Sequence, residues 1–130
     1  MAQWPPMGDD WHVTRTVLIV DDHESFRTAA RRMLEREGFE VVGEAVDGAS
    51  GIALARAAGP DLVLLDVVLP DLSGFDVADE LDGGVSKVVL VSSRSRADFG
   101  SRLRRSPVAG FISKDELSVD RIRELLEEAA

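Results

Sequence analysis

From Thr16 onward, short apolar runs alternate with longer segments in which apolar residues recur at helical spacing. Several of the runs are nearly continuous in Val, Ile and Leu, which is typical of strands that are buried on both faces of a sheet. The pattern therefore predicts five strand-helix units. The predicted strands are Thr16–Val20, Glu40–Val46, Asp61–Asp66, Lys87–Ser92 and Gly110–Ser113.

The segments between these runs predict five helices. In the first of them, Phe26, Met33 and Leu34 recur at helical spacing, and Gly38 provides a C-terminal stop. Because crossovers between parallel strands are right-handed, the alternation predicts an α/β fold with a five-stranded parallel sheet and helices on both faces. The predicted helices span residues 24–37, 50–58, 75–81, 97–105 and 119–129.

The first fifteen residues follow neither period. They hold both tryptophans, Trp4 and Trp11, among prolines and a glycine. We interpret residues 1–15 as an irregular N-terminal extension and residues 16–130 as one domain. A docking role for the two tryptophans is the alternative reading of this extension.

Charge and composition narrow the function. With 24 Asp plus Glu against 15 Lys plus Arg, the formal charge is −9. We therefore expect no direct nucleic-acid binding and no membrane partner, because the chain repels phosphate backbones and anionic surfaces. The chain has no cysteine, which excludes disulfides and thiolate chemistry. We expect a cytoplasmic location, because we find neither a run of roughly 20 apolar residues nor a secretory signal.

Polar residues gather where the predicted strands end. Asp21 and Asp22 follow the first strand, Asp66 ends the third, Ser92 ends the fourth and Lys114 follows the fifth. These ends meet at one edge of a parallel sheet. Carboxylates brought together in a partly buried cleft repel, so at least one has a raised pKa or a cation binds. Mg²⁺ is the cation that suits oxygen ligands best.

Asp66 stands at the end of an apolar strand that holds it rigidly, which makes it the candidate nucleophile. A carboxylate attacks a phosphoryl group to form an acyl phosphate. The oxygens of the transferred group then need positive charge and hydrogen-bond donors, which Mg²⁺, Lys114 and Ser92 supply. Each residue alone has a structural explanation, such as a helix N-cap for the acidic pair. Their occurrence together favours the chemical reading.

Three segments resemble the receiver domains of two-component signalling, and the resemblance extends over Thr16–Ala129. They are VLIVDDH from Val17, LLDVVLPDLSG from Leu64 and FISK from Phe111. His23 after the acidic pair, and Lys114 followed by Asp115, resemble the LuxR-type regulators within that family. We otherwise interpret His23 as a turn or helix-start residue, because imidazole is a poor ligand for Mg²⁺.

The resemblance implies a flavodoxin-like (βα)5 fold and a phosphoacceptor signalling domain. A sensor histidine kinase or a small phosphodonor would phosphorylate Asp66, with Ser92 and Lys114 contacting the phosphoryl group. The implied domain is not an enzyme beyond its own phosphorylation and dephosphorylation. The implied Mg²⁺ ligands are the carboxylates of Asp21, Asp22 and Asp66 and the backbone carbonyl of Val68.

The resemblance also implies a switch built from Ser92 and Phe111. When Ser92 turns toward the phosphoryl group, Phe111 rotates inward and changes the surface of the fourth helix, fifth strand and fifth helix. This surface would control an output domain or a partner, or form a homodimer. Physically, a local charge event biases a packing element between two states.

The chain departs from the family pattern at three places. Asp115 follows Lys114 where most relatives have proline, which leaves the geometry of that peptide open. The third helix is short and is followed by Gly83-Gly84. LuxR-type regulators usually continue into a DNA-binding domain, so both an isolated domain of a longer regulator and a single-domain protein remain open.

A basic cluster lies beside the predicted switch surface of this acidic chain. Its arginines form either a solvated helix face or a contact for an acidic surface of a partner or a second copy. Glu124, Glu127 and Glu128 are acidic candidates within the chain itself. The cluster consists of Arg94, Arg96, Arg102, Arg104 and Arg105.

Two other classes of protein remain alternatives. A phosphotransferase of the haloacid-dehalogenase type usually has a second Asp two residues after its nucleophile, where this chain has Val68. A flavodoxin-like binding module cradles phosphate after its first strand. Here Asp21 and Asp22 would repel phosphate at that point. Within the receiver interpretation, Val68 and Arg94 flank the site and restrict the attacking water, which predicts slow self-hydrolysis.

Overall fold

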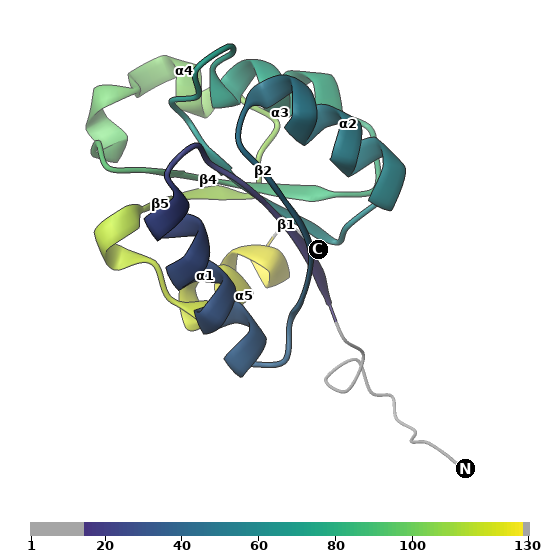
Figure 1. The fold of residues 1–130 in the computed structure, drawn as a ribbon. Helices are drawn as coiled ribbons and strands as arrows, with labels where there is room; N and C mark the ends of the chain where they lie inside the picture. The colour runs from purple at the N-terminus through teal and green to yellow at the C-terminus, as the bar shows by residue number, and fades with distance from the viewer. Residues whose placement is uncertain (1–14, 129–130) are drawn as a thin grey trace.

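The computed structural model describes residues 15–128, which form one parallel sheet with helices on both faces (Figure 1). The strand order is β2-β1-β3-β4-β5. This order confirms the predicted five-stranded parallel sheet of the flavodoxin-like type. The strands are β1 (Thr16–Val20), β2 (Glu40–Ala45), β3 (Leu62–Asp66), β4 (Lys87–Ser92) and β5 (Gly110–Ser113).

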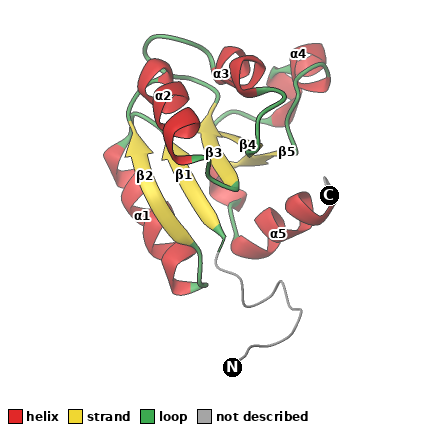
Figure 2. Ribbon diagram, turned by 90° about the vertical axis from the view of Figure 1, so that its right-hand side faces the viewer, coloured by secondary structure: helices red, strands yellow, loops and turns green. Residues whose placement is uncertain are grey.

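The helices cover the two faces of the sheet in two groups (Figure 2). Helices α1 and α5 pack on one face, and α2, α3 and α4 pack on the other. In β1, Val17 and Ile19 face the first group while Leu18 and Val20 face the second. The helices are α1 (Glu24–Arg36), α2 (Gly48–Ala58), α3 (Gly74–Leu81), α4 (Gly100–Arg104) and α5 (Val119–Glu128).

Side-chain caps explain why two helices begin earlier than predicted. The Asp47 carboxylate accepts the backbone N–H of Ser50, so that α2 begins at Gly48. Ser73 accepts the N–H of Asp76 in the same way, and α3 begins at Gly74. Both caps pair helix N–H groups that have no partner within the helix.

The prediction of one continuous basic helix over residues 97–105 is wrong. The chain forms a 3₁₀ turn, η2 (Arg96–Asp98), and then the short α4. Ser95 and Asp98 form a capping box around the turn, and Gly100 adopts a φ of +49° that interrupts the helix. The arginines of this region are therefore not presented on one regular helix face.

Lys114 and Asp115 lie in a second 3₁₀ turn, η3 (Lys114–Glu116). Residues 15–128 contain no cis peptide bond, so the peptide between these two residues is trans. Over the same residues, no helix is both long and apolar enough to cross a membrane. Trp4 and Trp11 lie outside the described residues, and so does most of the predicted irregular extension with its alternative docking role.

Candidate functional site

The carboxyl ends of the central strands bring the predicted site residues together. Asp21 directly follows β1, Asp66 ends β3, Ser92 ends β4 and Lys114 follows β5. Among the described residues, the buried polar side chains are Asp21, Asp66 and Ser92, and all three lie at this edge. Buried polar groups are costly unless they are paired, so this edge of the sheet is the candidate functional site.

Asp66 is only 3% exposed at the end of a fully buried strand. Its Oδ1 accepts the backbone N–H of Val68 at 3.2 Å, and its Oδ2 lies 3.4 Å from the Nζ of Lys114. Burial, followed by the charge of Asp21, raises the pKa of Asp66 to about 6, although Lys114 and the Val68 N–H oppose the shift. The raised pKa means that burial and the neighbouring Asp21 charge together disfavour the ionised form of Asp66.

Asp21 is held on both of its carboxylate oxygens. Oδ1 accepts the backbone N–H of His23 at 2.8 Å. Oδ2 lies 2.7 Å from Nζ of Lys114 in an ion pair, but no donor among the described residues forms a well-directed hydrogen bond to it. A buried carboxylate oxygen in this state suits a cation that binds oxygen ligands.

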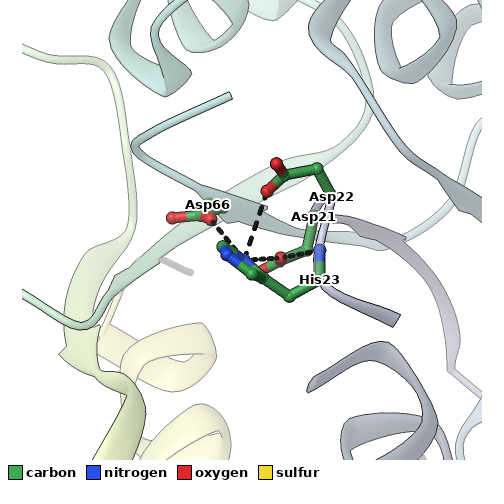
Figure 3. Close-up of side chains that lie close together, drawn as sticks. All are labelled: Asp21, Asp22, His23 and Asp66. Carbon is green, nitrogen blue, oxygen red and sulfur yellow. Dashed lines mark hydrogen bonds and ion pairs between the residues drawn. The ribbon is translucent and has the colours of Figure 1, made fainter. Parts of the chain in front are cut away.

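His23 turns its imidazole into the acidic cluster (Figure 3). Its Nδ1 lies 3.0 Å from Oδ1 of Asp21, 3.2 Å from Oδ1 of Asp22 and 3.9 Å from Oδ2 of Asp66. His23 is also the N-cap residue of α1, which agrees with the predicted helix-start position. The approach of its ring to three carboxylates was not predicted, because the position of His23 after the acidic pair does not fix the direction of its side chain.

The carboxylates satisfy the basic requirement of a metal centre. One ligand atom from each of Asp21, Asp22, His23 and Asp66 lies within 4.8 Å of the others. Asp22 and His23 are exposed while the other two are buried, so the cluster opens to solvent on one side. Three carboxylates are the hard oxygen donors that Mg²⁺ takes, and the imidazole is the least suited of the four groups. The Val68 carbonyl stays a predicted ligand.

Ser92 and Phe111, the two predicted switch residues, are both buried. Ser92 is buried, and its Oγ accepts the backbone N–H of Arg94 at 3.1 Å. Phe111 is already inside the core, 4% exposed, with its ring 5.7 Å from that of Phe99. The guanidinium of Arg96 lies 5.7 Å from the Phe111 ring centre. The structure thus describes Phe111 in an inward position, and its rotation on phosphorylation stays a prediction.

The basic cluster is partly engaged within the molecule. Arg102 lies 3.4 Å from Asp76 and 3.1 Å from Asp79, and its guanidinium lies 5.1 Å from the ring centre of Phe75. These contacts join α4 to α3. Arg104 and Arg105 are exposed, and they belong to the part of the basic cluster that faces solvent.

The loop after β3 is fixed from two sides. Gly74 N–H donates to the Val67 carbonyl at 2.7 Å, and a Cβ at position 74 would overlap the Asp66 carbonyl oxygen. Asp71 accepts the backbone N–H groups of Gly48 and Ala49 at the start of α2, at 2.7 and 3.0 Å. Asp71 was not predicted as a functional residue. Its contacts tie the Asp66 loop to a helix.

The family model of the response regulator receiver domain matches residues 17–127. The chain belongs to this family. Receiver domains are signalling domains of two-component response regulators, and in general they are not enzymes. Membership in this family therefore replaces the haloacid-dehalogenase and flavodoxin alternatives.

Three curated relatives are response or transcription regulators. The chain is similar to the transcription regulator BvgA of Bordetella pertussis, with 40% identity over 102 residues, 77% of this chain and 49% of BvgA. It is similar to the response regulator GacA of Pseudomonas aeruginosa, with 40% identity over 75% of this chain and 47% of GacA. It is 34% identical to PdtaR of Mycobacterium tuberculosis over 93% of this chain and 64% of PdtaR. The chain thus spans about half the length of BvgA and GacA.

Solved receiver domains share the fold. The signal receiver domain of the response regulator NarL from Mycobacterium tuberculosis gives a TM-score of 0.80 with 31% identity, covering 89% of this chain and 96% of that domain. A LuxR-family response regulator from Aurantimonas sp. gives a TM-score of 0.78 with 27% identity, covering 89% and 87%. These matches agree with the predicted resemblance to LuxR-type receiver domains.

Proposed function

We propose that this receiver domain is a phosphorylation switch in which Asp66 accepts a phosphoryl group from a sensor histidine kinase or a small phosphodonor. One observation carries the proposal: Asp66 is buried at the end of β3, with Lys114 3.4 Å away and Asp21 beside it. A buried carboxylate with a neighbouring cation and an acidic cluster is suited to phosphoryl transfer.

In the proposed transfer, a carboxylate oxygen of Asp66 attacks the phosphorus and forms an acyl phosphate. The bond from phosphorus to the donor atom breaks, and the donor leaves with the electron pair. Mg²⁺, held by Asp21, Asp22, Asp66 and the Val68 carbonyl, would neutralise charge on the phosphoryl oxygens. Lys114, which lies beside Asp66, and the hydroxyl of the buried Ser92 would contact the same oxygens.

The proposed switch begins at Ser92. Its Oγ accepts the Arg94 N–H, and a phosphoryl oxygen on Asp66 would attract the Ser92 hydroxyl as a donor. Phe111 already packs against Phe99, so a shift of the segment between β4 and α4 would accompany the predicted movement of Phe111. This segment leads directly into α4, and the α4-β5-α5 surface would control an output domain or a partner.

The same surface is the proposed homodimer contact. The exposed Arg104 and Arg105 are the basic groups available for it, since Arg102 is held by α3. Glu124, Glu127 and Glu128 on α5 are the acidic groups that they would meet in a second copy. We place the phosphorylated protein in the cytoplasm, and we expect it to contact neither nucleic acid nor membrane through this domain.

Intact-mass analysis after incubation with acetyl phosphate and Mg²⁺ tests the proposal. We expect one added phosphoryl group on the wild type and none on Asp66→Ala. Ser93→Ala is the matched control, since Ser93 is an exposed neighbour of the site and its loss should leave labelling intact. Equal labelling of the wild type and Asp66→Ala, or no labelling of the wild type even by its kinase, would contradict the proposal.

A further inference from the structure

Arg27 lies behind the acidic pair, in the first turn of α1. Its side chain is only 13% exposed. Nη1 donates to the backbone carbonyl of Asp21 at 2.7 Å, and Nε donates to Oε1 of Glu44 at 3.0 Å. The guanidinium therefore joins the end of β1 to β2 from its position on α1.

Glu44 holds Arg27 in this orientation. Its second oxygen, Oε2, lies 2.7 Å from Nη1 of Arg31, which is one turn further along α1. The hydrogen bond from Arg31, with further help from Arg27, lowers the pKa of Glu44, so the carboxylate is charged at neutral pH. Arg27 thus has one fixed ionic partner, and its Nη1 is directed at the Asp21 carbonyl.

The peptide that joins Asp21 to Asp22 connects two of the carboxylates proposed to hold Mg²⁺. Because a peptide unit is planar, fixing its carbonyl oxygen fixes the whole plane between the two residues. The Asp21 N–H is also fixed, since it donates to the Ala45 carbonyl at 3.0 Å. Arg27 therefore fixes the orientation of the peptide between Asp21 and Asp22, and this peptide carries both carboxylate side chains.

We infer that Arg27 is a positioning residue, which orients the Asp21–Asp22 carboxylates for the divalent cation of the phosphoacceptor site. The inference rests on the proposed function, because it requires that this cluster binds the cation. Arg27 lies behind the peptide bond and acts through the backbone, so it is not a catalytic residue. Because its charge is paired with Glu44, Arg27 acts on cation binding mainly by orienting the Asp21–Asp22 backbone and not by its electric field.

Arginine is required because two donors must point in two fixed directions. The planar guanidinium presents Nε to Glu44 and Nη1 to the Asp21 carbonyl at once. A lysine carries the same charge on one flexible nitrogen and cannot hold both acceptors in this geometry. Arg27→Lys therefore separates the loss of geometry from the loss of charge.

Isothermal titration of Mg²⁺ into the protein without phosphodonor tests the inference. We expect Arg27→Met and Arg27→Lys to weaken Mg²⁺ binding by about tenfold or more, as loss of groups that orient metal ligands does elsewhere. Arg31→Met is the matched control, because Arg31 binds Glu44 from the same helix but does not contact Asp21. It should keep the affinity within about twofold.

Phosphorylation kinetics provide a second readout. If Arg27 acts by positioning, the Arg27 variants need more Mg²⁺ for half-maximal labelling by acetyl phosphate, but they approach the wild-type rate when Mg²⁺ is saturating.

Wild-type Mg²⁺ affinity in Arg27→Met, or an equal loss of affinity in Arg31→Met, would overturn the inference while the proposed function stands. If Arg27→Met does not fold, Arg27→Lys alone decides it. A wild type that binds no Mg²⁺ and takes up no phosphoryl group would instead overturn the proposed function, and the inference with it.

Discussion

Lys114 lies closer to Asp21 than to the phosphoacceptor, with its Nζ 2.7 Å from Oδ2 of Asp21. Nζ is 3.4 Å from Asp66, and it also lies 4.5 Å from the ring centre of Phe26. The lysine is only 16% exposed, so its charge is largely removed from water and acts on the buried carboxylates. Before any phosphoryl transfer, Lys114 is thus the counter-charge of a buried acidic pair.

Replacement of Lys114 by Met should therefore affect stability as well as phosphorylation. Removing one partner of a buried ion pair costs about 3–5 kcal/mol, and protonation of Asp66 will recover part of that cost. We expect Lys114→Met to be less stable than the wild type near neutral pH, with a smaller difference near pH 5, where Asp66 is largely protonated. Urea unfolding at the two pH values measures the difference.

Lys114→Arg keeps the charge and is the control for this comparison. It should retain more of the neutral-pH stability than Lys114→Met, although the wider guanidinium fits the contact with Asp21 less well. Labelling by acetyl phosphate should fall by roughly tenfold or more in Lys114→Met, because the phosphoryl oxygens lose a cation. Equal stability of wild type and Lys114→Met at neutral pH would contradict the assigned role.

The Asp66 carboxylate should destabilise the metal-free protein near neutral pH. Burial and the Asp21 charge raise the pKa of Asp66 to about 6 from an ordinary value of 3.8. Because the pKa of Asp66 is higher in the folded state than in the unfolded state, the folded state binds the proton more tightly. Protonation of Asp66 therefore stabilises the fold, and this stabilisation is fully present below about pH 4. It is lost as pH rises through about 6.

We therefore expect metal-free Asp66→Asn to be more stable than the wild type above pH 6, on the order of 2–3 kcal/mol if one pKa unit corresponds to about 1.4 kcal/mol. The advantage should shrink toward pH 4, and added Mg²⁺ should stabilise the wild type more than the variant. Urea unfolding in EDTA and in Mg²⁺ provides the measurement. A wild type that matches Asp66→Asn in EDTA at pH 7.5 would refute this account of the pocket.

How far the site could be predicted from the sequence depends on what holds each residue. Asp21, Asp66 and Ser92 follow apolar runs that can only be buried strands, so the sheet topology alone brings them to one edge. The direction of the His23 ring is a choice of rotamer, which depends on the three carboxylates around it. Local sequence carries no direct signal for that choice.

The segment after β4 shows more clearly where prediction from the sequence fails. Alanine and arginine favour a helix over residues 97–105, but Ser95 and Asp98 close a 3₁₀ turn and Gly100 takes a positive φ. The inward position of Phe111 depends on Phe99, which comes from this irregular segment. Tertiary packing therefore decides both features.

Gly74 should be intolerant of any side chain. A Cβ there would overlap the Asp66 carbonyl oxygen and lie 2.8 Å from Cα of Val67. We expect Gly74→Ala to destabilise the protein by about 1–3 kcal/mol and to slow labelling, because the backbone of the phosphoacceptor must shift. Gly43→Ala is the control, since its Cβ would meet only the Leu18 side chain at 3.4 Å. Urea unfolding and acetyl phosphate labelling should separate the two variants; similar results for both would contradict the assigned packing.

The effect of Asp71 on folding stability should depend on pH in the opposite direction to the effect of Asp66. The backbone N–H groups of Gly48 and then Ala49 lower the pKa of Asp71. A depressed folded-state pKa means that the contribution is present above the unfolded value, near 4, and is lost as pH falls through the folded value. Asp71→Asn should thus lower the urea midpoint at neutral pH, with the difference disappearing in acid.

Asp82→Asn is the matched control for Asp71, because Asp82 is an exposed aspartate in the turn after α3. The same pH series on this variant should show a smaller change. If Asp71→Asn follows the wild type at every pH, the link between the Asp66 loop and α2 does not stabilise the fold.

Val68 and Arg94 should lengthen the lifetime of the phosphorylated state. Val68 is 55% exposed two residues after Asp66, and Arg94 is exposed two residues after Ser92. An apolar side chain and a bulky one beside the phosphoryl group offer the attacking water no general base and restrict its approach. We expect Val68→Asn and Arg94→Ser each to speed loss of the phosphoryl group by roughly threefold to tenfold, which is a change of about 1 kcal/mol in the barrier.

The measurement is intact mass against time after the phosphodonor is removed. Val85→Asn is the matched control, since Val85 is 80% exposed and precedes β4 at the other end of the sheet. The control should keep the wild-type lifetime, because it changes surface polarity without changing access to Asp66. A wild-type label that decays as fast as that of Val68→Asn would show that water already reaches the acyl phosphate freely, and that these two side chains do not protect it.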